Sequence, residues 1–227
     1  MISRPKWAET RLHYTFQNPD LLERALTHRS ASKHNNERLE FLGDSYLSFA
    51  VARELYVRRP ADTEGDLSRA RAALVKQSTL AAVGQRLGVD AVLVLGQGEL
   101  RSGGAQRAAV LADAVEALIG AVLLDGGVAA AEALVQALLA EDLAGLPDAE
   151  TLKDPKTKLQ ELLQGRGLGL PAYTVSRIEG RDHAQTFNVI CEIGFKSLST
   201  TGQGNSRRGA EQDAAAAMIV VLASELD

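Results

Sequence analysis

Three carboxylates occur at helical spacing within residues 35–47, whose sequence is NNERLEFLGDSYL. In a helix Glu37, Glu40 and Asp44 would lie within about 60° of one another, because each residue turns by about 100°. Acids at this spacing usually form a solvated face, but the same stripe continues into apolar residues, and so does the other side of the helix. The apolar positions are Leu47, Val51 and Leu55 on the stripe, and Leu42, Tyr46 and Phe49 opposite. The sequence therefore predicts a largely buried helix that carries acids.

A second pair of acids stands in an apolar segment with no cation nearby. Asp113 and Glu116 are the only charged residues of 108–124. They are three positions apart and so share one face of a helix. Lys and Arg are absent from 108–152. Because buried unpaired carboxylates are costly and adjacent ones repel, something must compensate: protonation, a distant arginine, or a metal. Two buried acid-bearing helices that face each other favour the metal.

The donor set indicates which metal and which chemistry to expect. Carboxylates without a histidine partner are typical of a hard cation, Mg²⁺ or Mn²⁺. A di-iron centre in a helical bundle would need Glu-x-x-His pairs, and neither helix has one. A carboxylate-held Mg²⁺ acts mostly on phosphates, activating water and stabilising charged oxygens. Glu64, in DTEGDLS, is a further candidate, although a helix N-terminus favours acids for its own reasons.

Composition limits the class of protein. The chain has 227 residues, enough for one large or two modest domains. Its single cysteine, Cys191, excludes an internal disulfide framework, and no Cys/His cluster suggests zinc. No uninterrupted apolar run is long enough to span a bilayer, and the first residues lack a signal peptide. These features predict a cytoplasmic protein that does not enter a membrane. The net charge of −4 means that any nucleic-acid surface must come from clustered cations.

The two parts of the chain follow different patterns. Up to about residue 144 the sequence predicts helices, and a glycine-rich loop is expected at 96–104. The predicted helices cover 39–59, 64–88, 109–127 and 128–145. After a polar, proline-bearing linker, the pattern becomes α-β-β-β-α. That part comprises a helix at 157–167, strands at 172–180, 185–193 and 195–204, and an alanine-rich helix at 206–224.

The motif NERLEFLGDS resembles the signature of bacterial ribonuclease III. ALTHRS before it, EGDLS after it and LADAVEALIGA further on match that family in the same order. The last third of the chain is similar to a double-stranded-RNA-binding domain. The resemblance implies an all-α catalytic domain over residues 1–147, a linker at 148–153, and an α+β RNA-binding domain over 154–227.

The resemblance also implies an activity and roles for the acids. The expected enzyme is a Mg²⁺-dependent endonuclease, in which Mn²⁺ can substitute and no organic cofactor takes part. It would cut both strands of double-stranded RNA, such as ribosomal RNA precursors, leaving 5′-phosphates, 3′-hydroxyls and short 3′ overhangs. In the family pattern the metal ligands are Glu40, Asp113 and Glu116, the residues most essential to hydrolysis are Asp44 and Glu116, and the assisting acids are Glu37 and Glu64.

Two kinds of partner follow from the same resemblance. The catalytic domain is expected to form a homodimer with Phe41 packed across the interface, although Phe41 also fits an ordinary core position. Gln160 and His183 would contact the minor groove of double-stranded RNA, while Arg207 and Arg208 would bind phosphates across the major groove.

Cations cluster near the starts of two helices of the second domain, at Lys153, Lys156 and Lys158 and at Arg207 and Arg208. The family usually has a lysine where this chain has Gly209. That departure removes a phosphate contact and a helix-favouring residue.

Two other functions remain open. One is a non-enzymatic double-stranded-RNA-binding protein with a degenerate nuclease fold, against which the complete set of acids argues. The other is a metal-dependent hydrolase of small phosphorylated molecules, which the RNA-binding domain disfavours.

Overall fold

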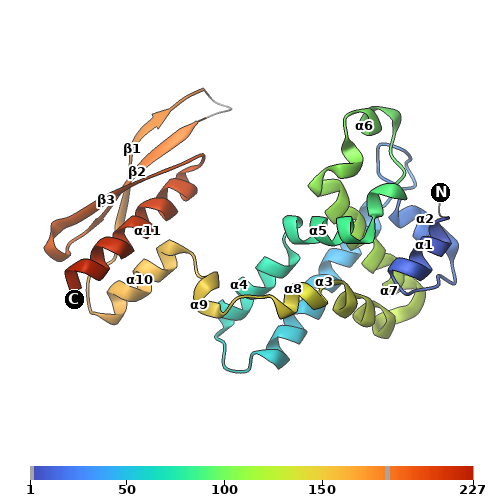
Figure 1. Cartoon of the computed structure of the whole chain (residues 1–227), viewed down its shortest axis with the longest axis horizontal. Helices are drawn as coiled ribbons and strands as arrows, with labels where there is room; N and C mark the ends of the chain where they lie inside the picture. The colour runs from blue at the N-terminus through green and yellow to red at the C-terminus, as the bar shows by residue number, and fades with distance from the viewer. Residues whose placement is uncertain (1–2, 182–184, 227) are drawn as a thin grey trace. The chain divides into compact units, whose positions relative to one another are not determined.

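The computed structural model describes residues 3–181 and 185–226. The chain divides into two compact units, Met1–Ala149 and Glu150–Asp227 (Figure 1). The first unit is built from helices and the second combines helices with a sheet. The predicted class, an all-α domain followed by an α+β domain, is therefore confirmed.

The first unit contains eight α-helices among its described residues. The predicted helix over 64–88 is divided at Lys76, whose backbone is extended, and part of the predicted glycine-rich loop is the short helix α6. The elements are α1 (Arg4–Arg11), α2 (Pro19–Ala25), α3 (Glu37–Arg58), α4 (Glu64–Val75), α5 (Gln77–Leu87), α6 (Gln97–Arg101), α7 (Ala108–Leu138) and α8 (Ala140–Ala144), with the 3₁₀ turns η1 (Val89–Ala91) and η2 (Gly104–Gln106).

Helices α3 and α7 cross in backbone contact at two glycines. A Cβ atom on Gly43 would overlap the carbonyl oxygen of Glu116, and one on Gly120 would overlap that of Leu39. Only residues without a Cβ allow helices to approach this closely. The crossing lays the acidic stretch of α3 against the acidic stretch of α7, so two rigid elements position the carboxylates.

Helix α7 bends after its acidic half. Gly127 has φ 75° and ψ −173°, a conformation that favours glycine. Next to the bend, Asp125 accepts hydrogen bonds from the hydroxyl of Tyr14 and from the backbone N–H groups of Gln17 and Asn18, each at 2.8 Å. The bend is thereby tied to the loop before α2. The sequence predicts that one helix ends at residue 127 and another begins at 128, whereas the structure has a kink at this point inside the single helix α7.

Helix α7 is also long and apolar enough to cross a membrane, if only length and composition are considered. The criterion of an uninterrupted apolar run misses this, because Asp113 and Glu116 divide the segment. Many of its residues are buried and it packs against α3 and α5, which is the environment of a core helix. One such helix is weak evidence for a membrane span.

Helix α3 is not buried on all sides, which corrects the expectation from its sequence. The predicted inner stripe is correct, since Leu47, Val51 and Leu55 are at most 1% exposed. On the outer side, however, Phe49 is 60% exposed and Phe41 is 76% exposed. An apolar outer face is indistinguishable in sequence from a second buried face, because periodicity does not show what covers it.

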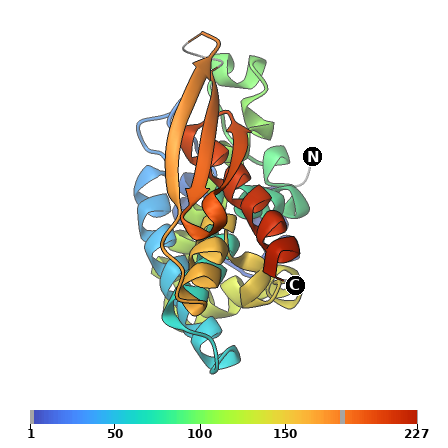
Figure 2. The ribbon, with the colours of Figure 1, turned by 90° about the vertical axis from the view of Figure 1, so that its left-hand side faces the viewer.

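The second unit packs two helices on one face of a three-stranded antiparallel sheet in the order β1-β2-β3 (Figure 2). Asp154 begins α10 by accepting a hydrogen bond from the N–H of Thr157, as an N-cap residue does. Buried side chains from α10, β2 and α11 form the core, and Cys191 is among them. The elements are α9 (Ala149–Leu152), α10 (Pro155–Gly165), β1 (Ala172–Glu179), β2 (Thr186–Ile193), the 3₁₀ turn η3 (Phe195–Ser197), β3 (Leu198–Gly204) and α11 (Arg207–Leu226).

Candidate functional site

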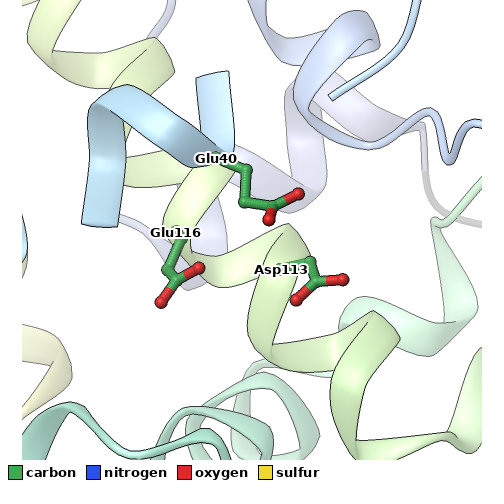
Figure 3. A group of neighbouring side chains, drawn as sticks. All are labelled: Glu40, Asp113 and Glu116. Carbon is green, nitrogen blue, oxygen red and sulfur yellow. The ribbon is translucent and has the colours of Figure 1, made fainter. Parts of the chain in front are cut away.

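Three carboxylates from the two crossing helices meet in the first unit. Glu40 comes from α3, while Asp113 and Glu116 come from α7 (Figure 3). One oxygen from each residue lies within 4.8 Å of the others, and all three residues are partly buried. This group of three, the acid cluster, offers only oxygen ligands and could hold a hard divalent cation.

Crowding and burial both act against ionisation in the acid cluster. Burial, and then the charges of Asp44, Asp113 and Glu40, raise the pKa of Glu116 to about 7. Burial followed by the charge of Asp113 also raises the pKa of Glu40. Burial raises the pKa of Asp113 as well. A cation bound among these oxygens would remove the repulsion and favour the charged forms.

Two basic side chains of the ALTHRS segment lie near the acid cluster, which the sequence did not indicate. The charges of His28 and Arg29 oppose the burial that raises the pKa of Asp113. Arg29 is itself paired with Glu37, its Nη1 lying 3.5 Å from Oε1. A cavity of about 540 Å³ opens beside these residues. An arginine from a distant part of the chain therefore compensates the charge of Asp113 only in part, because the pKa of Asp113 remains raised.

The other predicted acids, Asp44, Glu37 and Glu64, are not members of the acid cluster. Asp44 is exposed on α3, and its charge is the largest effect after burial on the pKa of Glu116. Glu37 is exposed at the start of α3. Glu64 is exposed at the start of α4, where it accepts a hydrogen bond from the hydroxyl of Ser68 at 2.8 Å. The structure does not bring Glu64 into the acid cluster.

In the second unit, a cleft of about 790 Å³ adjoins the first turns of α10 and α11. We call it the α10–α11 cleft. It gathers three predicted RNA contacts, Gln160, Arg207 and Arg208, all of them exposed. The fourth, His183, lies outside the residues that the structure describes.

Two further residues line this cleft: Lys156, which belongs to the cation cluster noted in the sequence, and Glu211, which no sequence pattern indicated. They form an ion pair of 2.6 Å although 55 positions separate them in the chain. Only the packing of α10 against α11 brings them together.

Comparison with known proteins agrees with this arrangement. Residues 18–143 match a family described as Ribonuclease-III-like, and residues 155–222 match the double-stranded RNA binding motif. The chain belongs to the ribonuclease III family. The resemblance noted in its sequence is therefore confirmed, and the protein is an endoribonuclease with a domain that binds double-stranded RNA.

Relatives in this family match along most of the chain. Ribonuclease 3 of Alkalilimnicola ehrlichii is 51% identical over 211 residues, which are 93% of this chain and 92% of that protein. Ribonuclease 3 of Pseudomonas fluorescens is 51% identical over 217 residues, covering 96% and 95%. Among solved structures, the ribonuclease III nuclease domain of Campylobacter jejuni matches with a TM-score of 0.61 at 36% identity, covering 64% of this chain and all of that one.

Proposed function

We propose that this ribonuclease III family member is a Mg²⁺-dependent endonuclease that hydrolyses both strands of double-stranded RNA. The products would carry 5′-phosphate and 3′-hydroxyl ends with short 3′ overhangs, and ribosomal RNA precursors and other structured transcripts in the cytoplasm would be substrates. The observation that carries the proposal is the convergence of three partly buried carboxylates in a chain with a double-stranded RNA binding motif. Mn²⁺ is expected to substitute, since it takes the same hard oxygen ligands.

Glu40, Asp113 and Glu116 would hold the ion. Their raised pKa values support this role, because the repulsion among them is relieved when a cation binds. When bound, Mg²⁺ lowers the pKa of a coordinated water and stabilises charge on the attacking and leaving oxygens. Asp44 is exposed and close enough to act on Glu116 electrostatically, so its carboxylate could accept a hydrogen bond from the attacking water.

The remaining residues would have supporting roles. Glu37 pairs with Arg29 and so would hold that arginine near the substrate phosphate. Glu64 would assist from outside the acid cluster. In the second unit, Gln160 and His183 would contact the minor groove, and Arg207 and Arg208 would bind phosphates. The position of Gln160 and the two arginines around one cleft supports this assignment.

We also propose that the first unit works as a homodimer. Phe41, Phe49 and Tyr56 lie on one side of α3 and are between 60% and 76% exposed. Exposed apolar residues gathered in this way are typical of an interface. The C. jejuni nuclease domain likewise has a region involved in dimer formation. Sedimentation velocity tests the proposal: Phe41→Ser should shift a wild-type dimer toward monomer, and a monomeric wild type would contradict it.

The main test is incubation of the full chain with end-labelled double-stranded RNA, in Mg²⁺ and in EDTA. Cleavage to short duplexes in Mg²⁺ alone is expected, with single-stranded RNA of the same sequence left intact. A small phosphate ester such as p-nitrophenyl phosphate serves as the substrate for the alternative hydrolase.

The outcomes separate the three candidate functions. Binding of double-stranded RNA without cleavage in either Mg²⁺ or Mn²⁺ would indicate a binding protein with an inactive nuclease fold. Turnover of the phosphate ester without cleavage of RNA would indicate a hydrolase of small molecules.

A further inference from the structure

The cations near the α10–α11 cleft are not equally available to a ligand. Lys153 pairs with Glu161 at 2.5 Å and with Glu150 at 2.9 Å. Lys156 and Arg207 are also paired, both of them with Glu211. Among the residues that the structure describes, Arg208 makes no ion pair. The number of cations in this region therefore overstates the number that can meet a phosphate without first breaking a contact.

Glu211 joins the two helix starts through one carboxylate. Its Oε2 accepts from Nζ of Lys156 at 2.6 Å, and its Oε1 accepts from Nε of Arg207 at 2.9 Å. The Glu211 side chain is only 12% exposed, so water competes less for these contacts than at an open surface. Hydrogen bonding to Lys156 is the main cause that lowers the pKa of Glu211. The carboxylate is therefore charged in the folded protein.

Lys156 is held on a second side as well. Its Nζ lies 4.4 Å from the centre of the Tyr173 ring, a position that a cation–π interaction favours. The Lys156 side chain is 33% exposed, and its backbone N–H donates to Oε1 of Gln212. Arg207 differs, since its side chain is 66% exposed and only Nε is engaged. Its two terminal nitrogens can still reach a phosphate.

We propose that Glu211 is a positioning residue for RNA binding: it withholds Lys156 from the RNA and turns the outer edge of Arg207 toward it. Phosphate binding at this cleft then depends on Arg208 and on the terminal nitrogens of Arg207, while Lys156 contributes no phosphate contact. This inference rests on the proposed binding of double-stranded RNA by the second unit. It assigns a role to Glu211, an acid inside a surface that must attract an anion.

The salt dependence of RNA binding tests the proposal directly. Each phosphate contact that is lost flattens the log–log plot of affinity against salt by roughly one unit. Lys156→Gln and Arg208→Gln both remove one positive charge from the same cleft. Under the proposal, Arg208→Gln flattens the slope by roughly one unit, and Lys156→Gln changes it by less than about half of that. The measurements use the full chain with a short RNA duplex in EDTA, where cleavage is not expected.

Removing the carboxylate should release the withheld lysine. Glu211→Gln keeps the size of the side chain, so Lys156 becomes able to reach a phosphate. The slope should steepen by roughly one unit and affinity at low salt should rise. The matched control is Glu192→Gln, which removes one exposed carboxylate from β2 and outside this cleft. In the Glu211→Gln background, Lys156→Gln should now flatten the slope by the amount that Arg208→Gln does in wild type.

The outcomes separate this inference from the proposed function. If wild type does not bind double-stranded RNA, the proposed function fails. If wild type binds and Lys156→Gln flattens the slope as much as Arg208→Gln, only the role of Glu211 is overturned. A folded Glu211→Gln protein with an unchanged slope overturns it too. Circular dichroism checks the folding of each variant, and if Glu211→Gln does not fold, the comparison of Lys156→Gln with Arg208→Gln decides alone.

Discussion

The two units differ in how far the charged side chains of their sites are paired with opposite charges. In the first, three acids converge within 4.8 Å, and the nearby Arg29 is already paired with Glu37. In the second, one partly buried carboxylate, that of Glu211, pairs with two cations at once. The acid cluster is left with excess negative charge, which protonation of Glu116 or a bound cation would reduce. The α10–α11 cleft has largely neutralised itself, and its ligand must compete with contacts that already exist.

This difference has consequences for stability and for binding. An unbalanced cluster costs stability until its ligand arrives, so ligand binding and folding are coupled. A balanced cleft costs little when empty, but part of its nominal charge is unavailable to RNA. Changes in the first unit should therefore alter metal response and chemistry, and changes in the second should alter affinity and its salt dependence.

The largest effect expected is on cleavage by Glu116→Gln. The substitution keeps size but removes a charge from the acid cluster, so the rate of RNA cleavage in Mg²⁺ should fall at least about a hundredfold. Affinity for the same duplex in EDTA should change little, because the second unit is untouched. Glu192→Gln, which removes one carboxylate from the other unit, is the control and should cleave normally. Cleavage by Glu116→Gln close to the wild-type rate would exclude Glu116 from the site.

Metal should stabilise the first unit, and its only tryptophan allows this to be measured in the full chain. Trp7 is the single tryptophan and is 3% exposed in α1, so its fluorescence follows unfolding of this unit. Saturating Mg²⁺ or Mn²⁺ should raise that melting temperature by roughly 5 °C.

A double variant provides the control for the metal response. Asp113→Asn with Glu116→Gln should melt above metal-free wild type, because the repulsion is gone, and should not respond to metal. If both proteins respond equally, the ion binds somewhere other than the acid cluster.

We also expect the melting temperature of the first unit to depend on pH, with a smaller effect than that of metal, and the same fluorescence measurement can detect it. The pKa of Glu116 is about 7 in the folded protein, against 4.5 for an unperturbed Glu. The folded state thus binds this proton more tightly than the unfolded chain, and the resulting stability is lost as pH rises through about 7. Metal-free wild type should melt lower at pH 8 than at pH 5, and Glu116→Gln should lose most of that difference. If the melting temperature rises from pH 5 to pH 8 in wild type but not in Glu116→Gln, the raised pKa of Glu116 is contradicted.

The smallest effect concerns Gly209 at the start of α11. A Cβ there would lie 3.3 Å from Oγ of Ser206, which accepts the N–H of Gly209, so a small adjustment of that hydroxyl accommodates a side chain. Gly209→Lys should tighten binding of the full chain to double-stranded RNA and steepen its salt slope by roughly one unit. Gly209→Ala adds helix propensity without charge. If Lys and Ala give the same slope, position 209 does not face phosphate.

Sequence patterns predicted the acid-bearing segments and the strands, but not every contact between elements. The stretch without Lys or Arg around Asp113 and Glu116 indicated that compensation must come from elsewhere, and the strand pattern located β1, β2 and β3. Local sequence cannot show the pair between Lys156 and Glu211, because tertiary packing creates it. His28 and Arg29 beside Asp113 were missed for the same reason.

Two further differences follow from limits of periodicity. The outer side of α3 carries the aromatic residues Phe41 and Phe49, which look buried in the sequence but are exposed. The bend at Gly127 resembles the end of a helix, since a glycine interrupts both. In both cases the outcome depends on which other segments pack against the helix, and the local sequence pattern does not contain that information.

The glycine crossing of α3 and α7 would also affect which ion fits the acid cluster, if a metal binds there as proposed. Gly43 and Gly120 set the distance between the helix that carries Glu40 and the helix that carries Asp113 and Glu116. Mg²⁺ needs oxygens at about 2.0–2.1 Å, whereas Ca²⁺ takes them at about 2.3–2.6 Å. A single methyl group at Gly43 would push the helices apart without altering any acid, and the enlarged cage would discriminate less well against the bigger ion. If the acid cluster holds Mg²⁺ as proposed, its preference over Ca²⁺ would therefore depend in part on two positions that have no side chain.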